Sequence, residues 1–207
     1  MVRPVTAPAG RISLSRADAL VIVDVQNDFV PGGSLAVPRG NEVVPVLNGY
    51  IEAFDAAGLP VFATRDWHPE NHCSFKAQGG PWPSHCVAGT LGAAFVPALA
   101  LPASVTTVSK ATERDRDAYS GFAGTGLEAS LRQRGVRRVF IGGLATDYCV
   151  LNTVRDACSL GFEVVLLADA VAAVNVTPGD GPKALAEMLR LGARPLVSGH
   201  LAGGARA

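Results

Sequence analysis

Apolar runs of strand length alternate along this chain with longer amphipathic stretches, and this alternation limits the possible folds more than any other feature. The runs at 20–23 and 164–167 are apolar at every position, so both faces of the strands they form must be covered. Such strands alternating with helices are typical of β-α units around a mostly parallel sheet. We therefore predict an α/β fold with strands at 19–25, 60–64, 105–109, 136–141, 162–168 and 195–198 and helices at 41–57, 125–134, 147–160 and 181–191.

Length and charge point to one domain that acts on a small molecule. The 207 residues suit a single domain, 1–207, with a core at about 17–199 and loosely held ends at 1–15 and 201–207. The net charge of zero gives no reason to expect nucleic acid or a membrane surface as partner. No stretch approaches the roughly 18 to 20 apolar residues of a membrane span. We expect a cytoplasmic protein with a small uncharged substrate.

The four cysteines show no C-x-x-C pair and no dense disulfide framework, which suits a reducing compartment. A disulfide between Cys73 and Cys86 is a less favoured alternative. Cys149 follows an apolar strand that breaks at Gly142-Gly143 and restarts as a helix, with Thr146 or Asp147 as the expected cap. Unpaired N–H groups in that first turn favour a thiolate, so we expect a pKa below the free value of about 8.5. A small buried cysteine that only packs the helix is the alternative.

Reactive residues stand at the ends of several predicted strands. Asp24 ends the first, Asp66 and His68 follow the second, Lys110 ends the third, and Cys149 follows the fourth. Ligands of open α/β sheets bind beyond the carboxyl ends of the strands, so these residues should converge. A nucleophilic thiol needs a base to take its proton and a cation to favour the anion, which suits Asp24 and Lys110. Taken alone, Asp24 could instead cap a turn and Lys110 could be a solvated surface residue.

The histidines indicate a metal site. If the strand stays extended, Asp66 and His68 lie on one face, because side chains alternate with a period of two. His72 and His85 follow, so three of the four histidines fall within 18 residues, while His200 is isolated and read as structural. One carboxylate with two imidazoles suits a divalent ion, and zinc, manganese and ferrous iron all remain open.

Two long segments without clear periodicity, 66–97 and 111–124, are candidate site-building loops. The second contains a charged run at 112–117, which could be a lid rim or an oligomer contact. Aromatic rings could wall a pocket for a flat ligand or could pack a lid. The rings in question belong to Phe29, Trp82, Tyr119 and Phe122.

Six motifs stand in order between about residues 19 and 197. They are Asp-Val-Gln-Asn-Asp-Phe at 24–29, Asp-Trp-His-Pro-Glu-Asn-His at 66–72, Trp-Pro-Ser-His-Cys at 82–86, Lys110, Tyr-Ser-Gly-Phe at 119–122 and Gly-Leu-Ala-Thr-Asp-Tyr-Cys at 143–149. Together they resemble the nicotinamidase/pyrazinamidase branch of the isochorismatase-like cysteine hydrolases. The resemblance implies a three-layer α/β/α sandwich with a mostly parallel sheet.

The resemblance also implies roles for individual residues. The implied catalytic set is Asp24, Lys110 and Cys149. The implied divalent metal ion is held by Asp66, His68 and His85, with His72 and Ser74 as further candidate ligands. A cis peptide between Leu144 and Ala145 is implied, with an oxyanion hole formed by the backbone N–H groups of Ala145 and Cys149. The implied substrate contacts are Phe29, Trp82, Tyr119 and Leu144.

The activity implied by the resemblance is hydrolysis of nicotinamide to nicotinate and ammonia through a cysteine thioester, with pyrazinamide as a second substrate and no organic cofactor. One alternative is a sibling hydrolase acting on a carbamoyl or ureido group, for which a metal that anchors a pyridine has no obvious use. Another is a catalytically silent binding module, which would not need Asp24, Lys110 and Cys149 together. The sequence leaves open a homo-oligomer and a role in NAD salvage.

Overall fold

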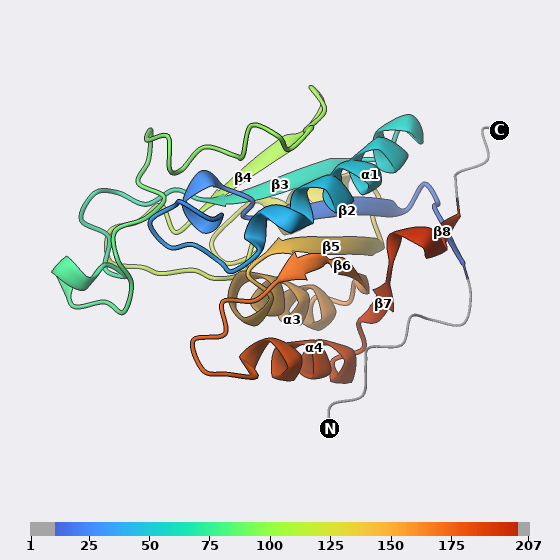
Figure 1. The fold of residues 1–207 in the computed structure, drawn as a ribbon. Helices are drawn as coiled ribbons and strands as arrows, with labels where there is room; N and C mark the ends of the chain where they lie inside the picture. The colour runs from blue at the N-terminus through green and yellow to red at the C-terminus, as the bar shows by residue number, and fades with distance from the viewer. Residues whose placement is uncertain (1–10, 203–207) are drawn as a thin grey trace.

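The computed structural model of the chain describes residues 11–202, and residues 1–10 and 203–207 lie outside the described part. Its central sheet has six strands in the order β4-β3-β2-β5-β6-β7, and every neighbouring pair is parallel (Figure 1). The strands are β2 (Asp18–Val23), β3 (Val61–Asp66), β4 (Thr106–Lys110), β5 (Arg138–Leu144), β6 (Glu163–Ala172) and β7 (Arg194–Leu196). All six predicted strands are present, with ends shifted by a few residues.

Helices cover both faces of this sheet. They are α1 (Val43–Ala56), α2 (Leu127–Gln133), α3 (Leu151–Ser159) and α4 (Asp180–Arg190). Alternate residues of β2 enter two separate cores: Leu20 and Ile22 pack in the core that contains α1, whereas Val21 packs in the core that contains α2, α3 and α4. Figure 1 shows α1 on one side of the sheet and α3 and α4 on the other. The predicted three-layer α/β/α sandwich is therefore confirmed.

The strand order places a crevice between β2 and β5. From β2 the chain builds outward through β3 and β4, and it then returns to the other side of β2 to build β5, β6 and β7. Ligands of open α/β sheets bind at such a reversal, beyond the carboxyl ends of the strands. The two strands approach closely at Gly143, where φ is +128° and an added Cβ would lie 2.1 Å from the Val23 carbonyl oxygen. A glycine is therefore required beside the crevice.

The two ends of the described chain pair with each other. Strand β1 (Ile12–Ser13) runs parallel to β8 (Leu201–Ala202) in a separate two-stranded sheet. Loosely held ends were expected here, because two-residue strands leave no periodic pattern in a sequence. A long-range contact supports β1, since the Arg138 guanidinium donates to the Ser13 carbonyl oxygen at 2.8 Å. Within residues 11–202, no helix combines the length and apolar character that crossing a membrane requires.

Candidate active site

The reactive residues predicted from separate strands meet at the carboxyl edge of the sheet. Asp66 and Lys110 are the last residues of β3 and β4, and Asp24 directly follows β2. Cys149 lies in a π-helical turn, Thr146–Val150, between β5 and α3. All four side chains are buried. The parallel topology of the sheet thus brings four distant segments of the chain together.

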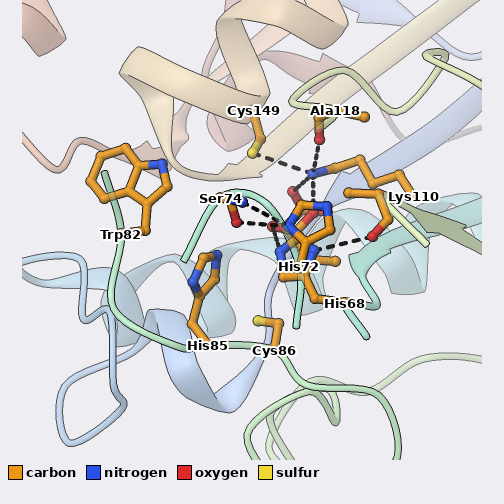
Figure 2. A network of polar contacts seen from close by, with 12 residues as sticks. His68, His72, Ser74, Trp82, His85, Cys86, Lys110, Ala118 and Cys149 are labelled. Atoms are coloured by element: carbon orange, nitrogen blue, oxygen red, sulfur yellow. Dashed lines mark hydrogen bonds and ion pairs between the residues drawn. The ribbon is translucent and has the colours of Figure 1, made fainter. Parts of the chain in front are cut away.

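Lys110 is the centre of this group. Its Nζ atom lies 2.9 Å from Asp24 Oδ2, forms an ion pair with Asp66, and donates to the Ala118 carbonyl oxygen at 3.1 Å. The same atom lies 3.5 Å from Cys149 Sγ, a contact drawn as a dashed line in Figure 2. Burial alone would lower the pKa of Lys110, but Asp24 and Asp66 raise it well above its ordinary value. The side chain is therefore a fixed ammonium between two carboxylates and a thiol.

Asp24 has the features of a base. Its backbone is in the left-handed region, with φ of +50°, and Thr64 Oγ1 donates to Oδ1 at 2.6 Å. Apart from its ion pair with Lys110, the buried Oδ2 accepts no hydrogen bond from residues 11–202. Burial raises the pKa of Asp24, and the charge of Lys110 opposes this rise. One carboxylate oxygen of Asp24 lies within 4.8 Å of Cys149 Sγ, so this carboxylate is placed to receive the thiol proton.

The expected lowering of the Cys149 pKa is wrong. Burial raises this pKa well above its ordinary value, the charge of Lys110 lowers it, and the carboxylates of Asp24 and Asp66 raise it again. Desolvation and two nearby negative charges therefore outweigh the one ammonium. A raised pKa favours the thiol, and a thiol needs a neighbouring base before it can act as a nucleophile.

The expected side-chain cap is also wrong. The residue before the turn is Ala145, and neither Thr146 nor Asp147 caps the turn through its side chain. Asp147 instead accepts the backbone N–H groups of Val174 at 2.9 Å and Asn175 at 2.7 Å. These partners follow β6, so the carboxylate ties the turn before α3 to the next loop rather than ending a helix.

Asp66, His68 and His85 form a group suited to a metal ion. One donor atom from each lies within 4.8 Å of the other two. His68 Nδ1–H donates to the Ala111 carbonyl oxygen at 3.1 Å, which leaves the buried His68 Nε2 without a hydrogen-bond partner in residues 11–202. His85 Nδ1–H donates to the Pro83 carbonyl oxygen at 2.8 Å. Carbonyl oxygens orient many metal-binding imidazoles in this way, so the residues present fit a divalent metal.

His72 and Ser74, the further candidate ligands, are engaged with the protein. His72 Nδ1 lies 2.7 Å from Ser74 Oγ, and its Nε2–H donates to the Arg116 carbonyl oxygen at 3.2 Å. The His72 ring stacks on His68 at 4.2 Å between centroids. Both nitrogens of His72 thus have protein partners, and the ring supports the position of His68 (Figure 2).

Sequence reasoning missed the role of Gln26. Its buried amide accepts the Asp66 N–H at 2.8 Å through Oε1 and donates through Nε2 to the carbonyl oxygens of Asp66 at 2.8 Å and Ala93 at 2.9 Å. The side chain fixes the backbone of a candidate metal ligand and joins it to the loop beyond β3. A buried glutamine directly after an apolar strand is the signal that could have revealed it, because such an amide needs several partners.

Asp28 is a second missed residue. Its Oδ2 accepts the Cys86 N–H at 2.7 Å, and its Oδ1 accepts the Ser34 N–H at 3.2 Å. Cys86 has a left-handed backbone, with φ of +46°, and follows His85 in the chain. Asp28 therefore holds the segment that carries His85.

Cys73 and Cys86 are both free thiols, so the structure does not contain the alternative disulfide between them.

A cleft of about 490 Å³, open solvent at its mouth included, connects these groups. Cys149, Asp66, His68 and His85 all contribute to its walls. The predicted aromatic residues Phe29, Trp82 and Tyr119 also line it, as does Tyr148, which the sequence did not single out. Trp82 Nε1 donates to the Tyr119 hydroxyl at 3.0 Å, and the Trp82 ring meets Tyr148 edge-on at 5.1 Å.

Two predicted wall residues lie elsewhere. Leu144 is fully buried in the core under α1 and does not line the cleft. Phe122 stacks on Phe162 at 6.0 Å between centroids and is partly buried against the core that contains α2, α3 and α4. Leu144 ends β5, and an apolar residue gives no sequence signal that separates a cleft wall from core packing.

The backbone before Cys149 has the form that the resemblance implies. The peptide between Leu144 and Ala145 is cis. The Ala145 carbonyl accepts the N–H groups of Tyr148 at 3.1 Å and Val150 at 3.0 Å, whereas the Ala145 N–H donates no hydrogen bond within residues 11–202. Ala145 and Cys149 both line the cleft.

A buried thiol beside a lysine and a carboxylate, at the carboxyl edge of this sheet, is the candidate site of a hydrolase with a cysteine nucleophile. The model of the Isochorismatase domain matches residues 18–196, and the chain belongs to the isochorismatase family. It is 38% identical over 205 residues to the nicotinamidase of Acinetobacter baylyi, an alignment that covers 88% of this chain and 94% of that protein.

Solved structures agree with this assignment. The pyrazinamidase of Pyrococcus horikoshii in complex with zinc matches with a TM-score of 0.84 and 51% identity, over 87% of this chain and 99% of that one. PnC1 from L. infantum in complex with nicotinate matches with a TM-score of 0.85 and 38% identity, over 93% of this chain and 98% of that one.

Proposed function

We propose that the protein is a nicotinamidase, which hydrolyses the carboxamide of nicotinamide to nicotinate and ammonia. The observation that carries the proposal is that Cys149 and the group Asp66, His68 and His85 line one aromatic-walled cleft, with the Lys110 ammonium behind the thiol at 3.5 Å from its sulfur. The names of the similar proteins support the same substrate class. A linear carbamoyl substrate would give the three-ligand group no evident use.

In the first step, Asp24 takes the proton of the Cys149 thiol, and the ammonium of Lys110 stabilises the sulfur anion that forms. The sulfur attacks the carboxamide carbon, so a C–S bond forms and the carbonyl oxygen becomes negative. The backbone N–H groups of Ala145 and Cys149 donate to that oxygen. Each such donor contributes about 2.7–4 kcal/mol to comparable acyl transfers.

In the second step, Asp24 gives its proton to the amide nitrogen, the C–N bond breaks, and ammonia leaves a thioester on Cys149. A water molecule then attacks the thioester carbon while Asp24 takes one of its protons. The C–S bond breaks, the sulfur regains the proton from Asp24, and the carboxylic acid ionises to nicotinate. The enzyme returns to its starting state.

Asp66, His68 and His85 would hold a divalent ion, for which zinc, manganese and ferrous iron are the candidates. When bound, it supplies a Lewis-acid contact for the lone pair of a pyridine nitrogen. The burial that lowers the pKa of His85 keeps that imidazole neutral, the form that binds metals. Phe29 and Trp82 contribute apolar ring surface to the same cleft, which suits a flat aromatic substrate. The proposed mechanism uses no organic cofactor.

Ammonia release from nicotinamide tests the function. The intact enzyme should release ammonia rapidly from nicotinamide and also from pyrazinamide, and Cys149→Ala should lose this activity by about 10⁴-fold or more while remaining folded. A linear carbamoyl compound serves as the matched substrate control. Release from the linear compound alone would assign the chain to a sibling activity, and release from neither would favour a binding module.

Metal removal tests the three-ligand group. Dialysis against a chelator should raise KM or abolish turnover, and adding back zinc, manganese or ferrous iron should restore activity and identify the usable ions. Full activity of metal-free enzyme would contradict the assigned role of Asp66, His68 and His85.

Four further expectations stay predictions: the single domain, the cytoplasmic location, the homo-oligomer and the role in NAD salvage.

A further inference from the structure

The charged run 112–117 contributes one side chain to the cleft. Two backbone contacts anchor the run: the Cys73 N–H donates to the Arg114 carbonyl oxygen at 2.8 Å, and His72 Nε2–H donates to the Arg116 carbonyl oxygen at 3.2 Å. The run is therefore held against the segment that follows β3. Asp117, at its end, lines the cleft and is exposed to solvent. Its carboxylate stands at the rim of the cleft.

Asp117 carries the uncompensated charge of this run. Arg114 lies 3.6 Å from Asp115, and Arg116 lies 3.8 Å from Glu113, so each arginine has its own acidic partner. Asp117 has no cationic partner within 4.0 Å among residues 11–202. A rim charge of this kind acts on whatever charged group enters the cleft.

The position of the Asp117 carboxylate is fixed from the catalytic side. Its Oδ1 accepts the N–H of Ala118 at 2.9 Å, and the Ala118 carbonyl oxygen accepts the Lys110 ammonium at 3.1 Å. Its field reaches the cleft wall: burial is the main cause that raises the pKa of Tyr119, and the charge of Asp117 adds to that rise. Asp117 thus lies one residue before the backbone carbonyl that accepts the Lys110 ammonium.

We propose that Asp117 is a specificity-determining residue that weakens the binding of carboxylate anions in the cleft relative to neutral carboxamides. The inference rests on the proposed function, in which a neutral amide becomes a carboxylate anion at the same position. Repulsion between the rim charge and the product favours departure of the acid and limits its competition with the next substrate. Because Asp117 is exposed to solvent, the dielectric constant of water applies, and one like charge about 3–6 Å away then changes affinity by about three- to tenfold.

Calorimetric titration tests this selectivity without turnover. Nicotinate and nicotinamide are each titrated into the zinc-loaded Cys149→Ala protein and into the same protein carrying Asp117→Asn. Asparagine keeps the Oδ1 acceptor for the Ala118 N–H and removes the charge. The ratio of the nicotinate Kd to the nicotinamide Kd should fall about three- to tenfold on Asp117→Asn. The difference should shrink at 1 M salt, where the Debye length is about 3 Å.

Asp115→Asn is the matched control, because it removes one negative charge from the same run at a side chain that does not line the cleft. It should leave the ratio unchanged. The inference is overturned if Asp117→Asn leaves the ratio unchanged or if Asp115→Asn shifts it equally. Failure of the intact enzyme to release ammonia would instead contradict the proposed function, so the two failures are separable.

Discussion

A buried carboxylate lies at each end of strand β2, and the two carboxylates differ in how fully they are hydrogen-bonded. At the amino end, Asp18 accepts two hydrogen bonds from Arg138, at 2.8 Å from Nε and 2.6 Å from Nη2, and a third from the Ser15 N–H at 2.7 Å. Bidentate pairs of this kind are strong and directional. Among residues 11–202, both oxygens of Asp18 have partners, and the pair joins β2 to β5.

At the carboxyl end, the charges are incompletely satisfied. Lys110 is shared between Asp24 and Asp66. Within the described chain, Asp24 Oδ2 has no partner apart from this ion pair, and the buried His68 Nε2 has no hydrogen-bond partner. Buried polar atoms without partners are rare in folded proteins, and they cluster where a ligand or a reacting proton completes the site. The two groups thus differ: both oxygens of Asp18 have partners, whereas the group at the carboxyl end leaves acceptor atoms available for the proposed chemistry.

Asp24→Asn should give the largest effect, because it removes the base at the reactive end. We expect kcat/KM for nicotinamide to fall by about 10²- to 10⁴-fold. In the intact enzyme the active form of Asp24 is the carboxylate, and burial raises its pKa, so activity should be lost as pH falls through a midpoint above the ordinary aspartate range. A pH profile of kcat/KM checks this, and a variant that keeps most of its activity would contradict the assigned role.

Asp18→Asn should affect stability instead of activity. It leaves the largely buried Arg138 without its counter-charge, and breaking a buried pair in this way costs about 3–5 kcal/mol. Asp18 and Asp24 are separated by about 20 Å along β2, so kcat/KM per folded molecule should stay at the parent value. Urea unfolding followed by tryptophan fluorescence measures the first effect and initial rates measure the second. Loss of activity without loss of stability would remove the distinction between the two ends.

Gln26→Met should give the smallest effect, because it changes a residue that only supports the reactive end of the sheet. Methionine keeps the length of the side chain and removes its three hydrogen bonds to Asp66 and Ala93. We expect a loss of about 1–3 kcal/mol in stability and a metal affinity about 10- to 100-fold weaker. Competition with a chromophoric chelator measures the affinity. An unchanged metal affinity would show that Asp66 does not need this support.

The sequence predicted the framework well because its signals are local. Apolar runs located all six strands and all four helices, and parallel topology then required Asp24, Asp66, Lys110 and Cys149 to share one edge. Strand β6 runs to Ala172, four residues beyond the predicted end, because its pairing with β5 continues past an irregularity near Gly143. The length of this pairing depends on β5, which lies elsewhere in the sequence, so the local pattern of β6 does not predict it.

What the sequence did not predict depends on distant partners. The direction of the Cys149 pKa shift follows from burial beside two carboxylates that arrive from other strands. Asp147 bonds to residues 27 and 28 positions away instead of capping its own turn. Tyr148 becomes a cleft residue only through the position of the π-helical turn that carries it. Motifs in the sequence identify candidate residues for the site. The balance of charges around Cys149 and the set of side chains that line the cleft depend on tertiary contacts.

The pairing of β1 with β8 has a practical consequence for handling the enzyme. Ser13 in β1 contacts Arg138, the partner of Asp18, so this small sheet lies at the edge opposite the cleft. Figure 1 shows β8 at that side of the molecule, away from the long loops that follow β3. Protein immobilised on a bead through a linker joined at either of these strands would present its cleft to the surrounding solution. Substrate would then reach the tethered catalyst as freely as the dissolved one.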